Sequence, residues 1–413
     1  MCHCIQKIAV KPQKLRAGII KSAVEYNRYC KDRWCNRLSG IPLRPTWAEV
    51  DLSAIAHNVR EFAGIVSSKT RLMAVVKADG YGHGAVQTAR AAISAGASFL
   101  GVALVEEALE LRQNGITIPI LILGFTPREY APALCEHDLT PTVFTLPEAE
   151  AFSAVAVRYG KRLDVHVKVD TGMNRVGYFP CEEADGFICQ IASLPGLNLT
   201  GLFTHFATAD QRDQTYARNQ FARFLSLINR LERQGVSVPL KHAANSAAAI
   251  SFSDAHLDMV RLGISLYGFY PSDEVSRETV NLRPAMTLKS RIIFLKDVPA
   301  STAVSYGCTY TTPEQSRLAT IPVGYADGYA RRLSNRGQVL VRGVRVPVVG
   351  RVCMDQTVIN VQGVPGVAEG EEVVLFGRQG DTVIDVDELA RWLDTINYEI
   401  VTSISYRVPR IYV

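Results

Sequence analysis

The chain has 413 residues, more than one typical domain requires, and we expect two domains that each bury a core of their own. Its composition, 47% hydrophobic and 21% charged, is that of an ordinary globular protein. Neither a signal peptide nor a transmembrane run of roughly 18 to 20 apolar residues is apparent. We therefore expect a cytoplasmic protein and no membrane partner. The net charge of +5 is concentrated at the N-terminus, and the remainder is slightly acidic, which argues against nucleic-acid binding by the main body.

Residues 1–44 are predicted to form a basic, solvated and partly disordered extension, because they hold ten Lys or Arg against only two acidic residues. Four of the nine cysteines lie there, at Cys2, Cys4, Cys30 and Cys35, and His3 stands among them. Their spacing fits no standard zinc finger, so we expect reduced, unpaired cysteines and no metal site.

From residue 45 to residue 278, short β-branched runs alternate with segments of helical period, such as Val105–Asn114 and Ala217–Arg233. This alternation predicts an α/β domain, and eight strands in about 220 residues favour a parallel (β/α)8 (TIM) barrel over the alternative, a doubly wound sheet. The eight predicted strands are Leu72–Val76, Phe99–Ala103, Pro119–Leu123, Pro141–Phe144, Leu163–Val169, Thr200–Phe206, Pro239–His242 and Met259–Leu262.

Residues 279–413 are predicted to form a mostly β C-terminal domain, because closely spaced strands replace the helices. MTLKSRIIFLKDV, GQVLVRGVRVPVVG and EEVVLFG are typical of these strands, and one late helix is expected at Val386–Leu393. The strand-like segment Trp47–Leu52 precedes the barrel helices, and the sequence leaves open which domain it pairs with.

Polar residues follow at least five of the predicted barrel strands, at the end where barrel enzymes carry their active sites. Lys77 ends the first strand in AVVKADGYGHG, and a desolvated lysine there tends toward the neutral amine that attacks carbonyls. Lys168 and Arg175 follow the fifth strand, His205 the sixth and Arg261 lies in the eighth. Together these residues indicate one active site.

Two further segments suit a phosphate group. Ser246 follows the seventh strand and opens a small-residue helix, so its hydroxyl and nearby amides could bind an anion. Gly263 and Ile264 follow the last strand, where barrels often hold phosphate. Taken singly, the first segment is better explained as a helix cap and the second as a tight turn.

In their order along the chain, these motifs resemble those of bacterial alanine racemases, pyridoxal-phosphate (PLP) enzymes with a barrel and a C-terminal β domain. The resemblance runs from about Thr46 to Val413, and residues 1–44 have no counterpart in it. The motifs that carry it are AVVKADGYGHG, DTGMNR, THFATAD, ANSAA, VRLGISLYG, SYG, IPVGYADGY, CMD and NYE followed by SYRVPR.

The resemblance implies a PLP enzyme that interconverts L-alanine and D-alanine for peptidoglycan, as a homodimer with shared active sites. It implies two catalytic residues, Lys77, which also holds the cofactor covalently, and Tyr306, which would come from the partner subunit. It implies Tyr81, Ser246, Gly263, Ile264 and Tyr398 around the cofactor phosphate, Arg261 with His205 at the pyridine ring, Arg175 and Met354 on the substrate carboxylate, a carbamylated Lys168, and Asp210, Tyr325, Arg331 and Arg351 along the access corridor.

Racemisation by these residues requires one base on each face of the α-carbon, and Lys77 and Tyr306 would supply them. Free tyrosine titrates near pH ~10, so a phenolate at neutral pH requires roughly 4 kcal/mol of differential stabilisation. We expect the cationic pair Arg261 and His205 to provide it. An arginine at the pyridine nitrogen keeps its own proton, which we expect to favour return of a proton to the α-carbon over side reactions.

Alternatives remain at this point. A racemase of serine or of a broader amino-acid range would use the same motifs, although Tyr398 should crowd a larger side chain. A non-catalytic PLP carrier would keep the barrel but would not require Tyr306 or the Cys353–Asp355 segment. A PLP decarboxylase would differ in the motifs given above.

Overall fold

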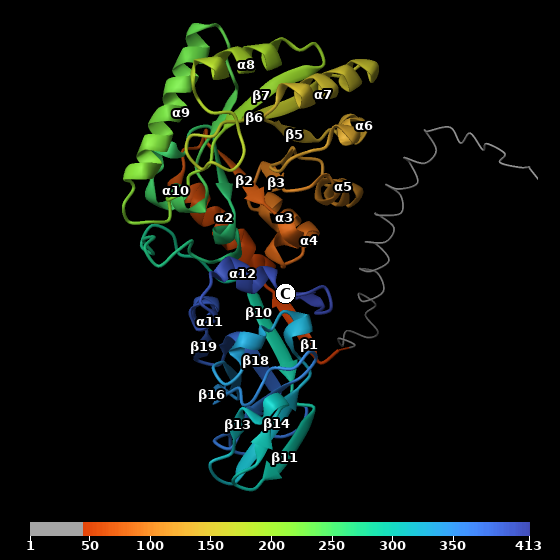
Figure 1. Cartoon of the computed structure of the whole chain (residues 1–413), viewed down its shortest axis with the longest axis vertical. Helices are drawn as coiled ribbons and strands as arrows, with labels where there is room; N and C mark the ends of the chain where they lie inside the picture. The colour runs from red at the N-terminus through yellow and green to blue at the C-terminus, as the bar shows by residue number, and fades with distance from the viewer. Residues whose placement is uncertain (1–43) are drawn as a thin grey trace, which may run out of the picture.

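The computed structural model describes residues 44–413, so the predictions for the N-terminal extension and its cysteines lie outside the described residues. Figure 1 shows two parts, a barrel with helices on its outside and a mostly β part, with helix α12 and the C-terminus where the two meet. Within residues 44–413, no helix is long and apolar enough to cross a membrane.

The first part is a parallel eight-stranded barrel, which confirms the predicted fold class and excludes the doubly wound sheet. The strand order is β8-β7-β6-β5-β4-β3-β2-β9. Two backbone hydrogen bonds join its ends, from Asp258 N–H to Lys241 O and from Arg261 N–H to Ala244 O, each 3.1 Å long. The strands are β2 (Arg71–Val75), β3 (Phe99–Val102), β4 (Ile120–Ile122), β5 (Thr140–Val143), β6 (Leu163–Lys168), β7 (Leu197–Phe203), β8 (Leu240–His242) and β9 (Met259–Leu262).

Helices cover the outside of the barrel, and the longer ones bury one apolar face each. In α9 the buried residues include Phe221, Phe224, Ile228 and Leu231, spaced by three or four positions as a helix with one buried face requires. The barrel helices are α2 (Leu52–Ile65), α3 (Lys77–Tyr81), α4 (Ala85–Ser94), α5 (Val105–Gln113), α6 (Ala131–Glu136), α7 (Leu146–Arg158), α8 (Glu182–Ser193), α9 (Thr215–Arg233) and α10 (Ser246–Ser251).

The second part is built on three sheets. The largest has the order β16-β15-β18-β10-β1-β20 with β19 on β18, a second joins β11, β14 and β17, and a hairpin joins β12 and β13. The elements are β1 (Thr46–Val50), β10 (Met286–Arg291), β11 (Phe294–Val298), β12 (Ala303–Val304), β13 (Tyr310–Thr311), β14 (Ser316–Ile321), β15 (Gln338–Val341), β16 (Val344–Pro347), β17 (Thr357–Asn360), β18 (Glu372–Gln379), β19 (Thr382–Ile384), β20 (Arg410–Tyr412), α11 (Val386–Leu393) and α12 (Asn397–Thr402).

The strand that opens the described chain, β1, belongs to the largest β sheet rather than to the barrel. It pairs antiparallel with β10 and parallel with β20, with Val50 opposite Met286 and Tyr412. The described chain therefore begins in the β part, passes through the barrel and returns to the β part. The domain boundaries proposed above, at residues 44/45 and 278/279, stay predictions.

Candidate active site

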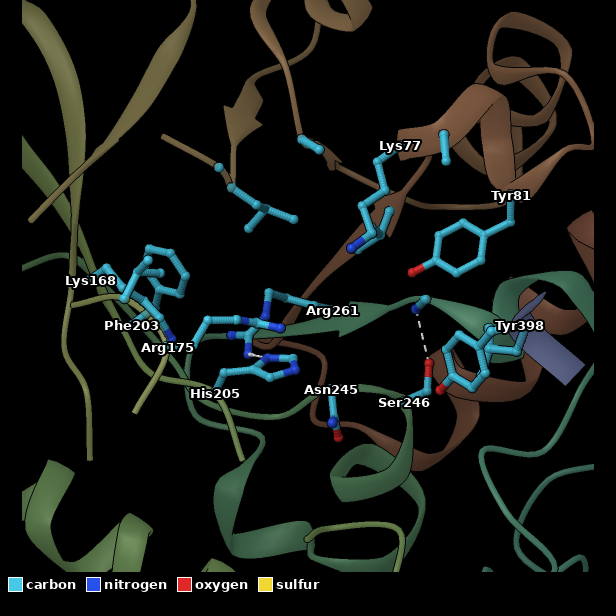
Figure 2. A pocket seen from close by; sticks show the side chains of 18 of the residues that line it. Lys77, Tyr81, Lys168, Arg175, Phe203, His205, Asn245, Ser246, Arg261 and Tyr398 are labelled. Carbon is cyan, nitrogen blue, oxygen red and sulfur yellow. Dashed lines mark hydrogen bonds between the residues drawn. The ribbon is translucent and has the colours of Figure 1, made fainter. Parts of the chain in front are cut away.

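A cavity of about 590 Å³ lies at the carboxyl ends of the barrel strands, as expected for an active site in this fold. It is lined from the barrel and, on one side, from α12. Among its lining residues are ten that the sequence predicted: Lys77, Tyr81, Lys168, Arg175, His205, Ser246, Arg261, Gly263, Ile264 and Tyr398. Figure 2 shows the Lys77 side chain pointing into this cavity, between Tyr81 on one side and Arg261 with His205 on the other.

Lys77 is carried by a strained backbone turn rather than by the strand itself. β2 ends at Val75, and residues 78, 79, 80 and 81 that follow Lys77 all have positive φ, at 52°, 52°, 62° and 51°. Three of these four are not glycine, and the left-handed conformation costs each of them roughly 1–2 kcal/mol. Such strain persists only where surrounding contacts hold it, and it is common at functional sites.

The Lys77 amine has a lowered pKa. Burial is the largest cause, and the positive charge of Arg175 adds to it, while Glu107 acts in the opposite direction. A lowered pKa raises the fraction of neutral amine at physiological pH. Lys77 is therefore suited to attack a carbonyl carbon and, afterwards, to exchange a proton.

Hydroxyl groups gather at one end of the cavity. The Ser246 hydroxyl accepts a hydrogen bond from Gly263 N–H at 2.9 Å, and the rings of Tyr81 and Tyr398 lie 6.2 Å apart. Burial raises the pKa of Tyr81 to about 12 and raises that of Tyr398 as well, so both phenols remain donors. A side chain on Gly263 would meet the Tyr81 hydroxyl at 3.1 Å, so glycine keeps this end open.

Arg261 closes the opposite end, where the two terminal nitrogens of its guanidinium donate hydrogen bonds to surrounding groups. It donates to Thr204 O and Ala243 O, each at 2.8 Å, to His242 Nδ1 at 2.9 Å and to His205 Nδ1 at 3.2 Å. Burial lowers the pKa of Arg261 to about 9, which still leaves it cationic at neutral pH.

The neighbouring histidines are neutral, which corrects the expectation of a cationic Arg261–His205 pair. Burial and the Arg261 charge hold the pKa of His205 and His242 well below the usual range, and that of His166 at about 3. Within this group of Arg261 and the three histidines, only Arg261 therefore carries a positive charge.

Lys168 and Arg175 lie together beside Phe203 (Figure 2). The Lys168 amine is buried, has no hydrogen-bond partner among residues 44–413 and lies 4.9 Å from the centre of the Phe203 ring. Burial, followed by the charges of Arg261 and Arg175, lowers its pKa well below the ordinary value. Burial thus favours the neutral form of this amine.

The loop that carries Arg175 is organised by Asp170, a residue that the sequence did not single out. Its carboxylate accepts hydrogen bonds from the backbone N–H groups of Gly172 and Asn174, both at 2.9 Å, and of Arg175 at 3.0 Å. The signal for Asp170 was its place in the motif DTGMNR. His166 and His242 were also missed, because nothing in the sequence shows that their rings meet.

The remaining predicted residues do not line the cavity. Tyr306, with 72% of its surface exposed, and Met354, with 52%, lie on loops of the β part. The Ser305 hydroxyl donates to Arg351 O at 2.7 Å, and the backbone N–H of Tyr325 donates to Cys353 O at 3.0 Å. The motifs SYG, CMD and YADGY therefore form a second cluster, which we call the β-part cluster (Tyr306, Tyr325, Arg351 and Met354). Arg331, on a short turn at Arg331–Leu333, and Asp210 also lie outside the cavity lining.

Comparison with known proteins identifies both parts of the chain. The family models described as alanine racemase N-terminal domain and C-terminal domain match residues 50–271 and 285–412. The alanine racemase of Desulfosudis oleivorans is 52% identical over 374 residues, which cover 89% of this chain and 96% of that protein. Among solved structures, the alanine racemase of Clostridium difficile matches with a TM-score of 0.86 at 41% identity, covering 89% of this chain and 96% of the other. The histidine racemase of Leuconostoc mesenteroides matches with a TM-score of 0.84 at 33% identity, covering 90% and 99%.

Proposed function

Because the chain belongs to the alanine racemase family, a family of PLP-dependent isomerases, we propose that it interconverts L-alanine and D-alanine by a two-base mechanism. The observation that carries this proposal is the Lys77 amine, which points into the cavity between the hydroxyl end and Arg261. The family role suggests that the product is D-alanine for peptidoglycan precursors, made in the cytoplasm.

The cavity residues fit PLP. Lys77 would hold the aldehyde carbon, and Arg261 would donate to the ring nitrogen. The phosphate would be held by the hydroxyls of Tyr81, Ser246 and Tyr398 and by the backbone at Gly263 and Ile264. Because Gly263 has no side chain, this end of the cavity stays open, which supports placing the phosphate there. When bound, PLP spreads the negative charge that remains when the α-proton leaves the substrate.

The protein residues would bind and orient alanine and move its proton. Arg175 is aimed into the cavity, where it would neutralise the substrate carboxylate, and Asp170 holds its loop in place. Lys77 would exchange the proton on one face of the α-carbon. Arg261 keeps its own proton, so the ring nitrogen beside it would stay unprotonated. His205 would orient Arg261 without adding charge.

We propose that the second base, Tyr306, acts in the active site of a second copy of this chain. Tyr306 is exposed on the turn Tyr306–Cys308, outside the cavity of its own chain, and the neighbouring β13 lies at the end of the β part remote from the barrel (Figure 1). In a homodimer the β-part cluster would meet the barrel cavity of the partner. Met354 would then contact the substrate carboxylate, and Tyr325, Arg331, Arg351 and Asp210 would line the access corridor.

We also propose that Lys168 carries a carbamate. Its neutral amine would add to the carbon of carbon dioxide, forming an N–C bond and releasing one proton, and the resulting anion would pair with Arg175. A carbonyl signal bonded to the Lys168 nitrogen, in protein equilibrated with ¹³C-labelled bicarbonate, would support it; absence of that signal from active protein would exclude it.

The test measures D-alanine formed from L-alanine by chiral separation, for wild type and for Lys77→Ala and Tyr306→Phe. We expect a rapid approach to a racemic mixture for wild type and a loss of at least about 10³-fold for each variant. Mixing the two inactive variants should restore activity, because a mixed dimer has one site with both bases. If wild type binds PLP but makes no D-alanine, the racemase proposal fails and the non-catalytic PLP carrier is favoured. Full activity of Tyr306→Phe would exclude the two-base assignment.

A broader substrate range is a second candidate, since a structural relative at 33% identity is named a histidine racemase. Tyr398 lines the cavity, where it would crowd a larger substrate side chain, which favours alanine. We expect kcat/KM for alanine to exceed that for serine and histidine by at least tenfold, and equal values would support the broader racemase.

A further inference from the structure

The strained turn after Lys77 is held by backbone hydrogen bonds within it, from Gly80 N–H to Val76 O at 2.9 Å and from Gly82 N–H to Ala78 O at 3.0 Å, and by side chains that bind its remaining backbone groups. Ala78, Asp79 and Tyr81 are non-glycine residues with φ near 50°, and L side chains rarely adopt this conformation. Within the segment, Asp79 accepts from Ala85 N–H at 3.0 Å, which ties the turn to α4. None of these bonds uses the backbone N–H of Ala78, the residue next to Lys77.

The Glu107 carboxylate binds this N–H group. One of its oxygens accepts from Ala78 N–H at 2.6 Å, and the other accepts from Ala103 N–H at 2.7 Å and from Leu104 N–H at 3.1 Å. Glu107 lies in the first turn of α5, directly after β3. One carboxylate therefore ties the residue after Lys77 to the end of the neighbouring barrel strand by three charge-assisted hydrogen bonds.

We propose that Glu107 is a positioning residue for Lys77, holding the strained turn so that the lysine amine projects into the cavity. The inference rests on the proposed function, in which Lys77 binds PLP. Glu107 does not line the cavity; it lies behind the turn, where it lines a separate hollow with Ala78 and Glu106. It therefore acts through Lys77 and not on the substrate.

The charge of Glu107 adds a second effect that a purely structural contact would lack. Glu107 raises the pKa of Lys77, against burial and Arg175, which lower it. The other titratable side chains that line the cavity with the lysine are Tyr81, Lys168, Arg175, His205, Arg261 and Tyr398. Removal of the Glu107 charge should lower the Lys77 pKa further, so the amine should become neutral at lower pH.

The experiment compares Glu107→Gln with Glu106→Gln, the same change at the adjacent residue, whose carboxylate instead accepts from the Tyr130 hydroxyl. PLP is titrated into apo-protein over a range of pH, and its uptake is followed by absorbance. We expect Glu107→Gln to bind PLP about 10-fold to 100-fold more weakly, and the pH midpoint of uptake to fall. Glu106→Gln should match wild type in both respects.

A third variant, Glu107→Asp, keeps the charge but is too short to bridge both sides of the turn. It should bind PLP more weakly with the wild-type pH midpoint, and it decides the question if Glu107→Gln does not fold. Wild-type affinity and midpoint in Glu107→Gln, or wild-type affinity in Glu107→Asp, would overturn the inference. Failure of wild type itself to take up PLP would instead overturn the proposed function.

Discussion

Single residues at the barrel mouth are fixed in one protonation state by the donors they face. Arg261 can only donate, so His242 must accept on Nδ1 and carry its proton on Nε2. That proton is then donated to His166 Nδ1, 3.0 Å away. The sequence placed only His205 beside Arg261 and could not reveal its charge, because the charge depends on this chain of donors and on burial.

His83 gives the clearest prediction about pH at the residue scale. Its Nδ1–H donates to Tyr81 O at 3.0 Å and to Gly80 O at 3.2 Å, while Nε2 is buried and has no partner in the part of the chain that the structure describes. Burial therefore lowers the His83 pKa to about 4. Between pH 6.5 and 4 the unfolded chain binds this proton and the folded chain does not, so stability falls as the pH falls, by about 3 kcal/mol in all for this group.

His83→Asn should keep a donor toward Tyr81 O and remove the titration. We expect its free energy of unfolding, measured by urea titration of apo-protein, to be lower than wild type at pH 7 because packing is lost. Between pH 6.5 and 4 its free energy of unfolding should then decrease less than that of wild type, by about 3 kcal/mol, because the variant lacks the one proton that His83 takes up on unfolding. The control is His137→Asn, at the end of α6, and an unchanged pH slope in His83→Asn would contradict the assignment.

At the scale of elements, local sequence patterns predicted most strands because burial and β-branched residues act locally. β9 was predicted with its observed bounds, whereas β7 was placed three residues too late, at Thr200–Phe206 instead of Leu197–Phe203. The pattern missed that Gly201 lies in the middle of a strand, opposite the ring of His166 on β6. Helix α12 was also missed, because six residues are too few to show a helical period.

Gly201→Ala should destabilise the barrel, because β7 at this point packs directly on His166. A methyl group on Gly201 would lie 2.4 Å from the His166 ring, which cannot move without breaking its hydrogen bond to His242. We expect a loss of roughly 1–3 kcal/mol in the free energy of unfolding, measured by urea titration.

The matched control is Gly186→Ala on α8, where the added methyl would meet no atom within 4 Å. Alanine is the better helix former, so this change should raise stability by roughly 0.5–1 kcal/mol. Effects of the same sign in both variants would argue against the packing of β7 described here.

At the scale of the whole molecule, the site could be predicted only in part. Strand ends converge in any parallel barrel, so the cavity residues followed from their positions in the chain. The placement of Tyr306 and Met354 did not, because loops of the β part bring their motifs together over long sequence separations. Glu107 escaped notice for the same reason: its partners, Ala78 and Ala103, are backbone groups whose meeting depends on the assembled fold.

The loops of the β part are anchored by a residue at the start of the described chain. Arg44 binds the buried carboxylate of Asp327 with two hydrogen bonds, of 2.5 Å and 2.7 Å, and Arg407 approaches the same carboxylate at 3.5 Å. Asp327 lies on the turn Tyr325–Asp327, whose backbone is bound to Cys353 O and Met354 O. Arg44 therefore supports the β-part cluster that is proposed to meet the cavity of a second chain.

Arg44→Met should leave Asp327 buried with less compensation for its charge. Complete loss of a partner in a buried pair typically costs 3–5 kcal/mol, but Arg407 and the Gly324 N–H, 3.0 Å from the carboxylate, remain, so we expect a loss of roughly 2–3 kcal/mol by urea titration. Because the displaced turn carries Tyr325, the KM for alanine should rise more than kcat falls. Arg44→Lys keeps the charge but not the two-pronged contact and should lose less than half as much. Wild-type stability and KM in Arg44→Met would mean that Arg407 alone holds the turn.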